Sequence, residues 1–161
     1  MKKIVALCLA LGLLLCFTAC APKSLLEADC DVYTVKGMSI TLPEVFEEVD
    51  YTWVTASYHT TEVTVFVVRE VAADMTLAEY AQAVYEANEY REPSAIADVE
   101  GLTTMEYSFY EPAGMKTVCY FATMFEGPDA FWLIQFSCDE GDYETYRPYF
   151  IEWAKTVTFE Q

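Results

Sequence analysis

The stretch 115-MKTVCYFATMFEGPDAFWLIQFSC-138 decides the fold of this chain. Its two halves, 115–125 and 131–138, are rich in aromatic and β-branched residues, and Gly127-Pro128-Asp129-Ala130 between them is a turn signal. Strands joined by so short a turn pair antiparallel, so the stretch predicts a β-hairpin inside an antiparallel sheet. If the turn closes the hairpin, Glu126 faces Phe131, and Cys119 then lies opposite Cys138 on the apolar face.

Further segments on both sides of this hairpin alternate at strand spacing or repeat at helical spacing. Thr76-Leu77-Ala78-Glu79 is a capping box, and it predicts a helix that ends at Arg91-Glu92-Pro93. A second helix is expected after Asp142, which can cap it. We predict an α+β fold, one antiparallel sheet of about six strands flanked by two main helices. The other predicted strands are 32–35, 38–42, 51–58, 62–71, 96–101 and 102–110, and 156–159 is a candidate closing strand.

The order of these segments resembles the PsbP-like (Mog1/PsbP) α/β/α sandwich over about residues 32–159. The residues that carry the resemblance are Met38-Ser39-Ile40-Thr41-Leu42-Pro43, Thr76-Leu77-Ala78-Glu79-Tyr80-Ala81 and Asp142-Tyr143-Glu144. Known members include a photosystem-associated lumenal subunit and a small-GTPase-binding protein, so the resemblance implies a binding role and supplies no catalytic residue.

The N-terminus has the pattern of a bacterial lipoprotein signal. Lys2 and Lys3 precede an apolar run of 14 residues, 4–17, and Thr18-Ala19-Cys20 resembles the end of a lipobox, with Phe17 where Leu is usual. The resemblance implies cleavage after residue 19 and lipidation of Cys20. The alternative is an uncleaved spanning helix, but at about 1.5 Å per residue the run covers only ~21 Å of a ~30 Å hydrocarbon core.

These features predict the domain organisation and the location of the protein. We expect a signal peptide at 1–19, a lipidated tether at 20–31 and a single domain at 32–161, anchored through lipid on the outer side of the cell membrane. Loss of the signal removes two of the 9 basic residues and none of the 26 acidic ones, which leaves a formal charge of −19. Such a domain repels phosphate backbones, so we expect no nucleic acid partner.

The sequence carries no constellation of catalytic residues. His59 is the sole histidine, and it falls in a predicted turn. The sequence has no G-x-S-x-G elbow, phosphate-binding glycine loop, H-E-x-x-H or C-x-x-C motif. We therefore expect a non-enzymatic surface lipoprotein without a cofactor, which acts as a protein-binding or envelope-assembly module. The alternative is a small ligand-binding lipoprotein that recognises a cation, a glycan or a peptide.

The cysteines beyond the signal leave two interpretations open. Cys30 falls in the tether, and the hairpin register pairs Cys119 with Cys138. Directly opposed residues have Cβ atoms about 4.5–5.5 Å apart, near but slightly beyond the spacing of a disulfide. The pair forms either a disulfide, which an exported protein permits, or two buried free thiols that pack as small hydrophobes.

Two further groups of residues are candidates for binding. Tyr51 and Trp53 share a strand face with Thr55 and Ser57, a mixed surface that could stack a sugar or a peptide. An acidic cluster after the hairpin could offer oxygens to Ca²⁺, but its spacing departs from the EF-hand pattern and fits a helix start better, so no metal site is assigned. Its weak candidate ligands are Asp139, Glu140, Asp142 and Glu144.

Overall fold

A computed structural model describes residues 24–71 and 74–160 of the chain. The predicted signal peptide and the lipidation residue Cys20 lie outside the described residues. The strands are β1 (Cys30–Val35), β2 (Met38–Pro43), β3 (Glu47–Glu48), β4 (Ala56–His59), β5 (Val63–Val71), β6 (Ala97–Val99), β7 (Leu102–Glu111), β8 (Lys116–Glu126), β9 (Ala130–Asp139) and β10 (Thr158–Phe159). The helices are α2 (Leu77–Ala87) and α3 (Tyr143–Ala154), with short 3-10 turns η1 (Glu89–Arg91) and η2 (Glu140–Asp142).

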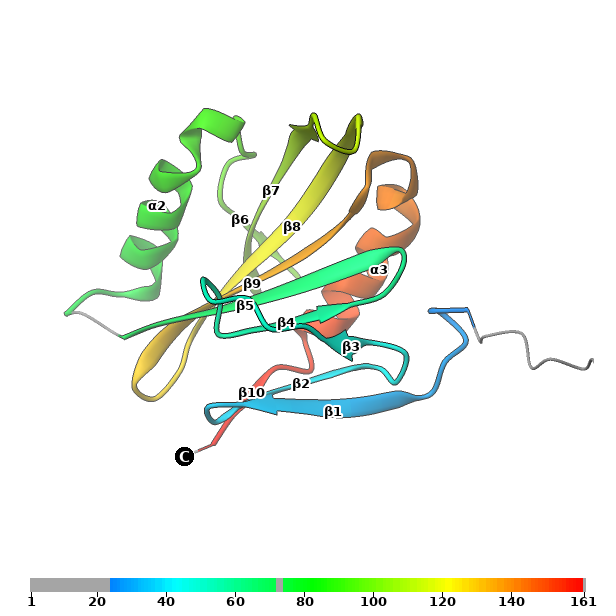
Figure 1. Cartoon of the computed structure of the whole chain (residues 1–161). Coiled ribbons are helices and arrows are strands. Elements are labelled where there is room, and N and C mark those ends of the chain that lie inside the picture. The colour runs from blue at the N-terminus through cyan, green and yellow to red at the C-terminus, as the bar shows by residue number, and fades with distance from the viewer. Residues whose placement is uncertain (1–23, 72–73, 161) are drawn as a thin grey trace, which may run out of the picture.

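The strands form two antiparallel sheets. The larger has seven strands in the order β3-β4-β5-β9-β8-β7-β6, and the smaller has three in the order β1-β2-β10. Helices α2 and α3 lie on opposite sides of the larger sheet (Figure 1). The α+β class with its two main helices is confirmed, while the strands divide over two sheets where the sequence predicted one of about six strands.

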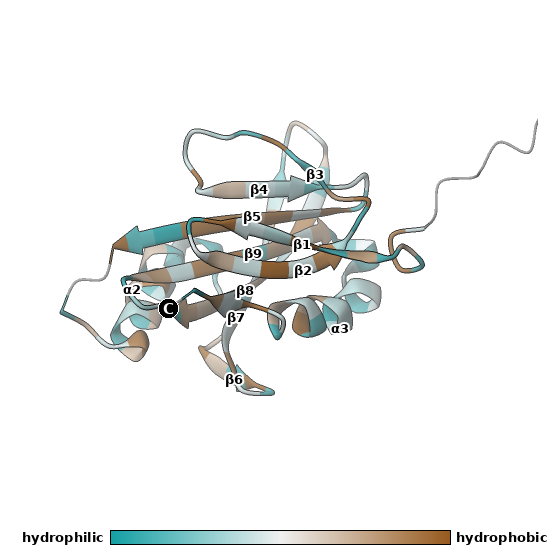
Figure 2. Cartoon of the chain, turned by 90° about the horizontal axis from the view of Figure 1, so that it is seen from below, coloured by the Kyte–Doolittle hydropathy of each residue, from teal (hydrophilic) through white to brown (hydrophobic). Residues whose placement is uncertain are grey.

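The hairpin that predicts the fold is β8–β9 at the centre of the larger sheet. Its register is the predicted one, with Phe121 opposite Phe136 and Cys119 opposite Cys138. Because side chains alternate between faces, this register sends one apolar stripe to each face of the sheet. Hydrophobic residues accordingly run along the central strands β5 and β9 (Figure 2).

Each face of the larger sheet carries its own core. On one face, Phe136 stacks on Phe150 of α3 with ring centroids 5.3 Å apart, and buried residues of β2 complete the packing. On the other face, Phe131 stacks on Tyr80 of α2 at 4.7 Å. The predicted capping box starts α2, with the Thr76 hydroxyl accepting from the Glu79 amide and the Glu79 carboxylate accepting from the Thr76 amide.

Three sequence predictions need correction. Of the predicted strand 51–58, only residues 56–58 lie in a strand, β4, which continues to His59; before them the Val54 amide donates to the Tyr51 carbonyl and turns the chain. Asp142 stands at the start of α3, but its side chain makes no capping hydrogen bond. The folded part also extends further toward the N-terminus than the tether 20–31 allows, since Leu25 belongs to the core and β1 begins at Cys30.

In the described part of the chain, none of the helices combines the length and apolarity that a membrane crossing requires.

Candidate functional site

Helix α2 leaves part of its sheet face uncovered. Its buried residues Tyr80, Ala81 and Val84 pack in one cluster with residues of β7, β8 and β9. On β4 and β5 the same face is covered by the loop that precedes β4. Between that loop and the β7–β8 hairpin the described residues leave a groove, which Tyr51 lines from the loop and Tyr120 from β8.

Four aromatic rings gather on this region, and we call them the aromatic platform: Tyr51 and Trp53 from the loop, His59 from β4 and Phe66 from β5. Ring centroids lie 5.0 Å apart for Trp53 and Phe66, 5.6 Å for Tyr51 and Trp53, and 5.6 Å for Tyr51 and His59. Trp53 is 62% exposed and Tyr51 is 40% exposed, so their ring surfaces are open to a ligand. The structure thus keeps the predicted pair together and adds two rings that the sequence analysis did not include.

Hydrogen bonds hold the two ends of the platform loop against β4 and β5. The Thr55 amide donates to the Val67 carbonyl, and the Thr55 hydroxyl accepts from the Arg69 amide. At the other end of the loop, the Val49 amide donates to the Ser57 carbonyl. Because both ends of the loop are fixed to the sheet, Tyr51 and Trp53 are held over Phe66.

Two hollows flank the platform. A groove of about 310 Å³ lies toward the β7–β8 hairpin, and Tyr51, Phe66 and Tyr120 are among its lining residues. A second hollow of about 460 Å³ lies toward β3 and includes Leu25 in its lining. His59 lines both, which places the platform between two recesses that together offer a ligand both aromatic and polar contacts.

His59 is half-buried at the end of β4, whereas the sequence placed it in a turn. Its Nδ1 lies 3.2 Å from the Thr64 hydroxyl, and its Nε2 has no hydrogen-bond partner among the described residues. Burial lowers the pKa of this imidazole from 6.5, so the ring is neutral at pH 7. The group beside its Nδ1 is a hydroxyl, whereas in a catalytic triad this position is taken by a carboxylate that orients the imidazole.

The walls of the two hollows are acidic. The described residues of the lining supply four carboxylates against the single ammonium of Lys116, and these carboxylates belong to Glu47, Glu62, Glu111 and Asp139. Asp139 accepts a hydrogen bond from Lys116 at 2.6 Å, and this bond raises the pKa of the lysine.

The carboxylates of Glu47 and Glu62 form no ion pair within residues 24–71 and 74–160. The groups that surround the platform therefore carry an excess of negative charge.

The predicted cysteine pair lies on the opposite face of the sheet. Cys119 and Cys138 are free thiols in the structure, and Cys138 is buried. The Gly127 amide donates to the Ala130 carbonyl and makes that pair a hydrogen-bonded one. Because the two kinds of pair alternate, Cys119 and Cys138 also form a hydrogen-bonded pair, the wider kind with Cα atoms about 5.5 Å apart. That Cα spacing suits a disulfide, but the Cβ atoms of directly opposed residues are about 4.5–5.5 Å apart, at the wider end in a hydrogen-bonded pair, and a disulfide requires about 3.8 Å, so the two Cβ atoms would have to move closer.

The acidic cluster is dispersed by the fold. Asp139 pairs with Lys116, Glu140 and Asp142 lie in η2, and Glu144 lies in the first turn of α3. In the part of the chain that the structure describes, no group of three or more His, Cys, Asp or Glu residues is placed to hold a metal ion.

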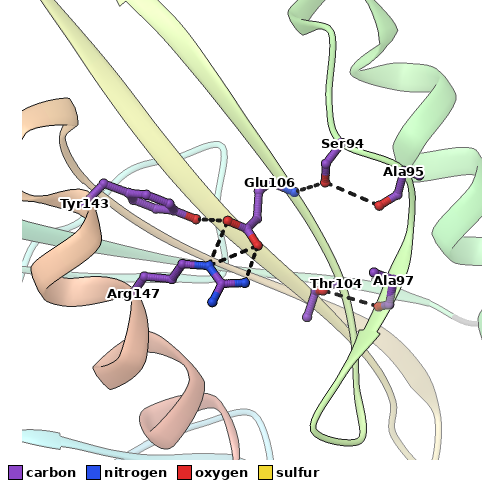
Figure 3. Close-up of polar contacts among 7 residues, drawn as sticks. All are labelled: Ser94, Ala95, Ala97, Thr104, Glu106, Tyr143 and Arg147. Atoms are coloured by element: carbon purple, nitrogen blue, oxygen red, sulfur yellow. Dashed lines mark hydrogen bonds and ion pairs between the residues drawn. The ribbon is translucent and has the colours of Figure 1, made fainter.

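The structure contains one polar cluster that the sequence analysis did not predict. The carboxylate of Glu106 on β7 accepts from the Arg147 guanidinium at 2.7 and 3.0 Å and from the Tyr143 hydroxyl at 2.6 Å (Figure 3). Burial raises the pKa of Glu106, but the bonds from Arg147 and Tyr143 outweigh it and hold the pKa below 4.5. These groups satisfy one another and join α3 to β7, so the cluster is a structural clamp.

No protein-family model matches the sequence, and no curated relative matches it either. Solved structures do resemble it. Cyanobacterial PsbP (CyanoP) from Synechocystis aligns with a TM-score of 0.58 at 11% identity, covering 89% of this chain and 99% of CyanoP. LpqN of Mycobacterium tuberculosis, which is involved in cell envelope biogenesis, aligns with a TM-score of 0.51 at 11% identity, covering 85% of this chain and 95% of LpqN.

A protein from Bacteroides thetaiotaomicron aligns with a TM-score of 0.58 at 8% identity, and the match covers 83% of this chain and 49% of that protein. These likenesses show the PsbP-like fold that the sequence resemblance implies.

Proposed function

We propose that this chain is a non-enzymatic lipoprotein, anchored through Cys20 on the outer side of the cell membrane, that binds an envelope protein through the aromatic platform. The observation that carries the proposal is the platform itself, two exposed rings held in place beside open recesses. A buried core uses its aromatic residues for packing, whereas Trp53 is 62% exposed although the loop that carries it is fixed to the sheet. Exposed Trp and Tyr side chains with this rigidity are typical of binding surfaces.

The predicted anchor and the fold support the same role. The lipobox-like segment ending at Cys20 favours attachment through lipid. LpqN, a structural neighbour with the same fold, is involved in cell envelope biogenesis, and a role in the envelope suits a lipid-anchored domain. A short tether keeps such a domain near the membrane, within reach of other envelope proteins.

Site-specific photo-crosslinking in the native host tests the proposal. A photoreactive phenylalanine analogue replaces Trp53 in one strain and Tyr149 in a control strain. Tyr149 is 39% exposed but belongs to α3, on the opposite side of the larger sheet. We expect a discrete crosslinked envelope protein from position 53 only. Identical products from both positions, or none from position 53, would exclude the platform as the binding surface.

A further inference from the structure

The chain already places one of its own cations among aromatic rings on the sheet face that carries the platform. The guanidinium carbon of Arg91 lies 5.0 Å from the ring centroid of Tyr90, 5.2 Å from that of Tyr107 and 5.6 Å from that of Phe109. Arg91 also donates to the Tyr107 hydroxyl at 3.2 Å. Aromatic faces attract cations because the ring quadrupole is negative above its plane.

In the described part of the chain, the platform offers the same chemistry without a cation of its own. Lys116 is the single basic residue that residues 24–71 and 74–160 contribute to the lining of the two hollows, and it is paired with Asp139. The rings of Tyr51 and Trp53 are exposed, while Glu47 and Glu62 add negative charge nearby. A cation placed here would meet ring faces and carboxylates together, and both interactions favour it.

We propose that the aromatic platform and its two hollows bind a positively charged polypeptide segment, with arginine or lysine side chains laid over Tyr51 and Trp53. This inference rests on the proposed function, because it names the chemistry of the partner at the same surface. Charge complementarity selects this occupant. The chain carries 26 acidic against 9 basic residues, so a basic segment is attracted from a distance. A neutral glycan can donate hydrogen bonds to the carboxylates around the platform, but it gains no such long-range attraction.

Hexa-arginine and its neutral isostere hexa-citrulline are the probes, titrated into the full chain in neutral detergent at about 0.15 M salt, where surface charges are screened beyond ~8 Å. Trp53 is a specific optical reporter, since Trp132 and Trp153 are at most 7% exposed. We expect saturable quenching by hexa-arginine and none by hexa-citrulline. Calorimetry then measures the affinity of the variants that lack the reporter.

Two matched comparisons distinguish binding of hexa-arginine at the platform from its general electrostatic attraction to an acidic protein. The double variant Tyr51→Ala/Trp53→Ala should bind hexa-arginine about 5- to 30-fold more weakly, the range of cation–π contacts, while Tyr149→Ala binds as wild type. Glu47→Gln/Glu62→Gln should weaken binding more than Glu86→Gln/Glu144→Gln. The second pair removes the same charge from exposed positions on the two helices. Circular dichroism verifies that each variant is folded.

Equal losses from the two glutamate pairs, or full affinity in the aromatic double variant, would overturn the inference. Binding of tri-N-acetylglucosamine in the absence of hexa-arginine binding would overturn it too and would assign the platform to a glycan. A crosslinked partner at position 53 without hexa-arginine binding refutes only the ligand chemistry and leaves the proposed function standing. Platform-dependent hexa-arginine binding without a crosslinked partner at position 53 would support the ligand chemistry of the platform and refute the proposed binding of an envelope protein there.

Discussion

The clamp between Glu106 and Arg147 allows a quantitative test of how α3 is held to the sheet. The proposed changes are Glu106→Gln, Arg147→Met and the double variant, compared in a double-mutant cycle. The glutamine keeps the size of Glu106 and removes its charge. The methionine keeps most of the aliphatic length of Arg147 and removes the guanidinium, whose carbon lies 5.9 Å from the centroid of the Phe121 ring. The cycle isolates the energy of the pair from that of its surroundings.

The magnitude follows from the geometry. A hydrogen bond to a charged group contributes about 1.5–3 kcal/mol, and the two-pronged arginine–carboxylate contact is the strong form. The Arg147 and Glu106 side chains are 31% and 28% exposed, so water screens part of this energy. We expect a coupling energy of about 1–2 kcal/mol.

The pair Lys116–Asp139 is the control, because its side chains are 45% and 51% exposed. We expect its coupling to be about 0–0.5 kcal/mol.

The coupling also depends on pH in a definite direction. The pKa of Glu106 lies below 4.5 in the folded protein, so its stabilising contribution is complete above that value. It is lost as the pH falls through the folded pKa and the carboxylate is protonated. Urea unfolding of the four proteins at about pH 7 and about pH 3 measures both effects. Equal coupling for the two ion pairs, or an Arg147–Glu106 coupling that is unchanged at about pH 3, would refute the reasoning.

Two further predictions concern the cysteines. In the denatured chain without reductant, Cys30, Cys119 and Cys138 should all react as free thiols. In the native chain the exposed Cys30 should be alkylated first, since burial raises the pKa of the Cys138 thiol to about 12. If two thiols are missing from the denatured count, the Cβ atoms of Cys119 and Cys138 lie closer together than their hydrogen-bonded pairing implies. The variant Cys20→Ala should lose fatty-acid labelling in the native host and be released or retain its signal, and equal label on wild type and variant would return the N-terminus to a spanning helix.

The parts of the fold that the sequence predicts are those with a local or strictly periodic cause. The β8–β9 register follows from the short turn between Gly127 and Ala130, because a turn of fixed length sets the pairing of every residue along the two strands. The capping box at Thr76 depends on residues three positions apart. The contact of Glu106 has no such local cause, because its partner Arg147 is 41 positions away. Alternation along the strand predicts that Glu106 faces solvent, whereas in the structure α3 covers that face.

One part of the platform can be predicted from the local sequence, and another part depends on contacts between segments that the sequence pattern does not reveal. Tyr51 and Trp53 stand out in the sequence as aromatic residues among hydroxyl side chains, a composition that a buried strand rarely has. Residues 51–55 leave the sheet because the turn at Val54 replaces strand pairing, a competition between local hydrogen bonds that residue alternation does not reveal. This departure carries the Trp53 ring to 5.0 Å from Phe66, a residue of the neighbouring strand. The error in the predicted strand and the existence of the binding surface therefore have one origin: the loop that fails to continue β4 is the loop that builds the platform.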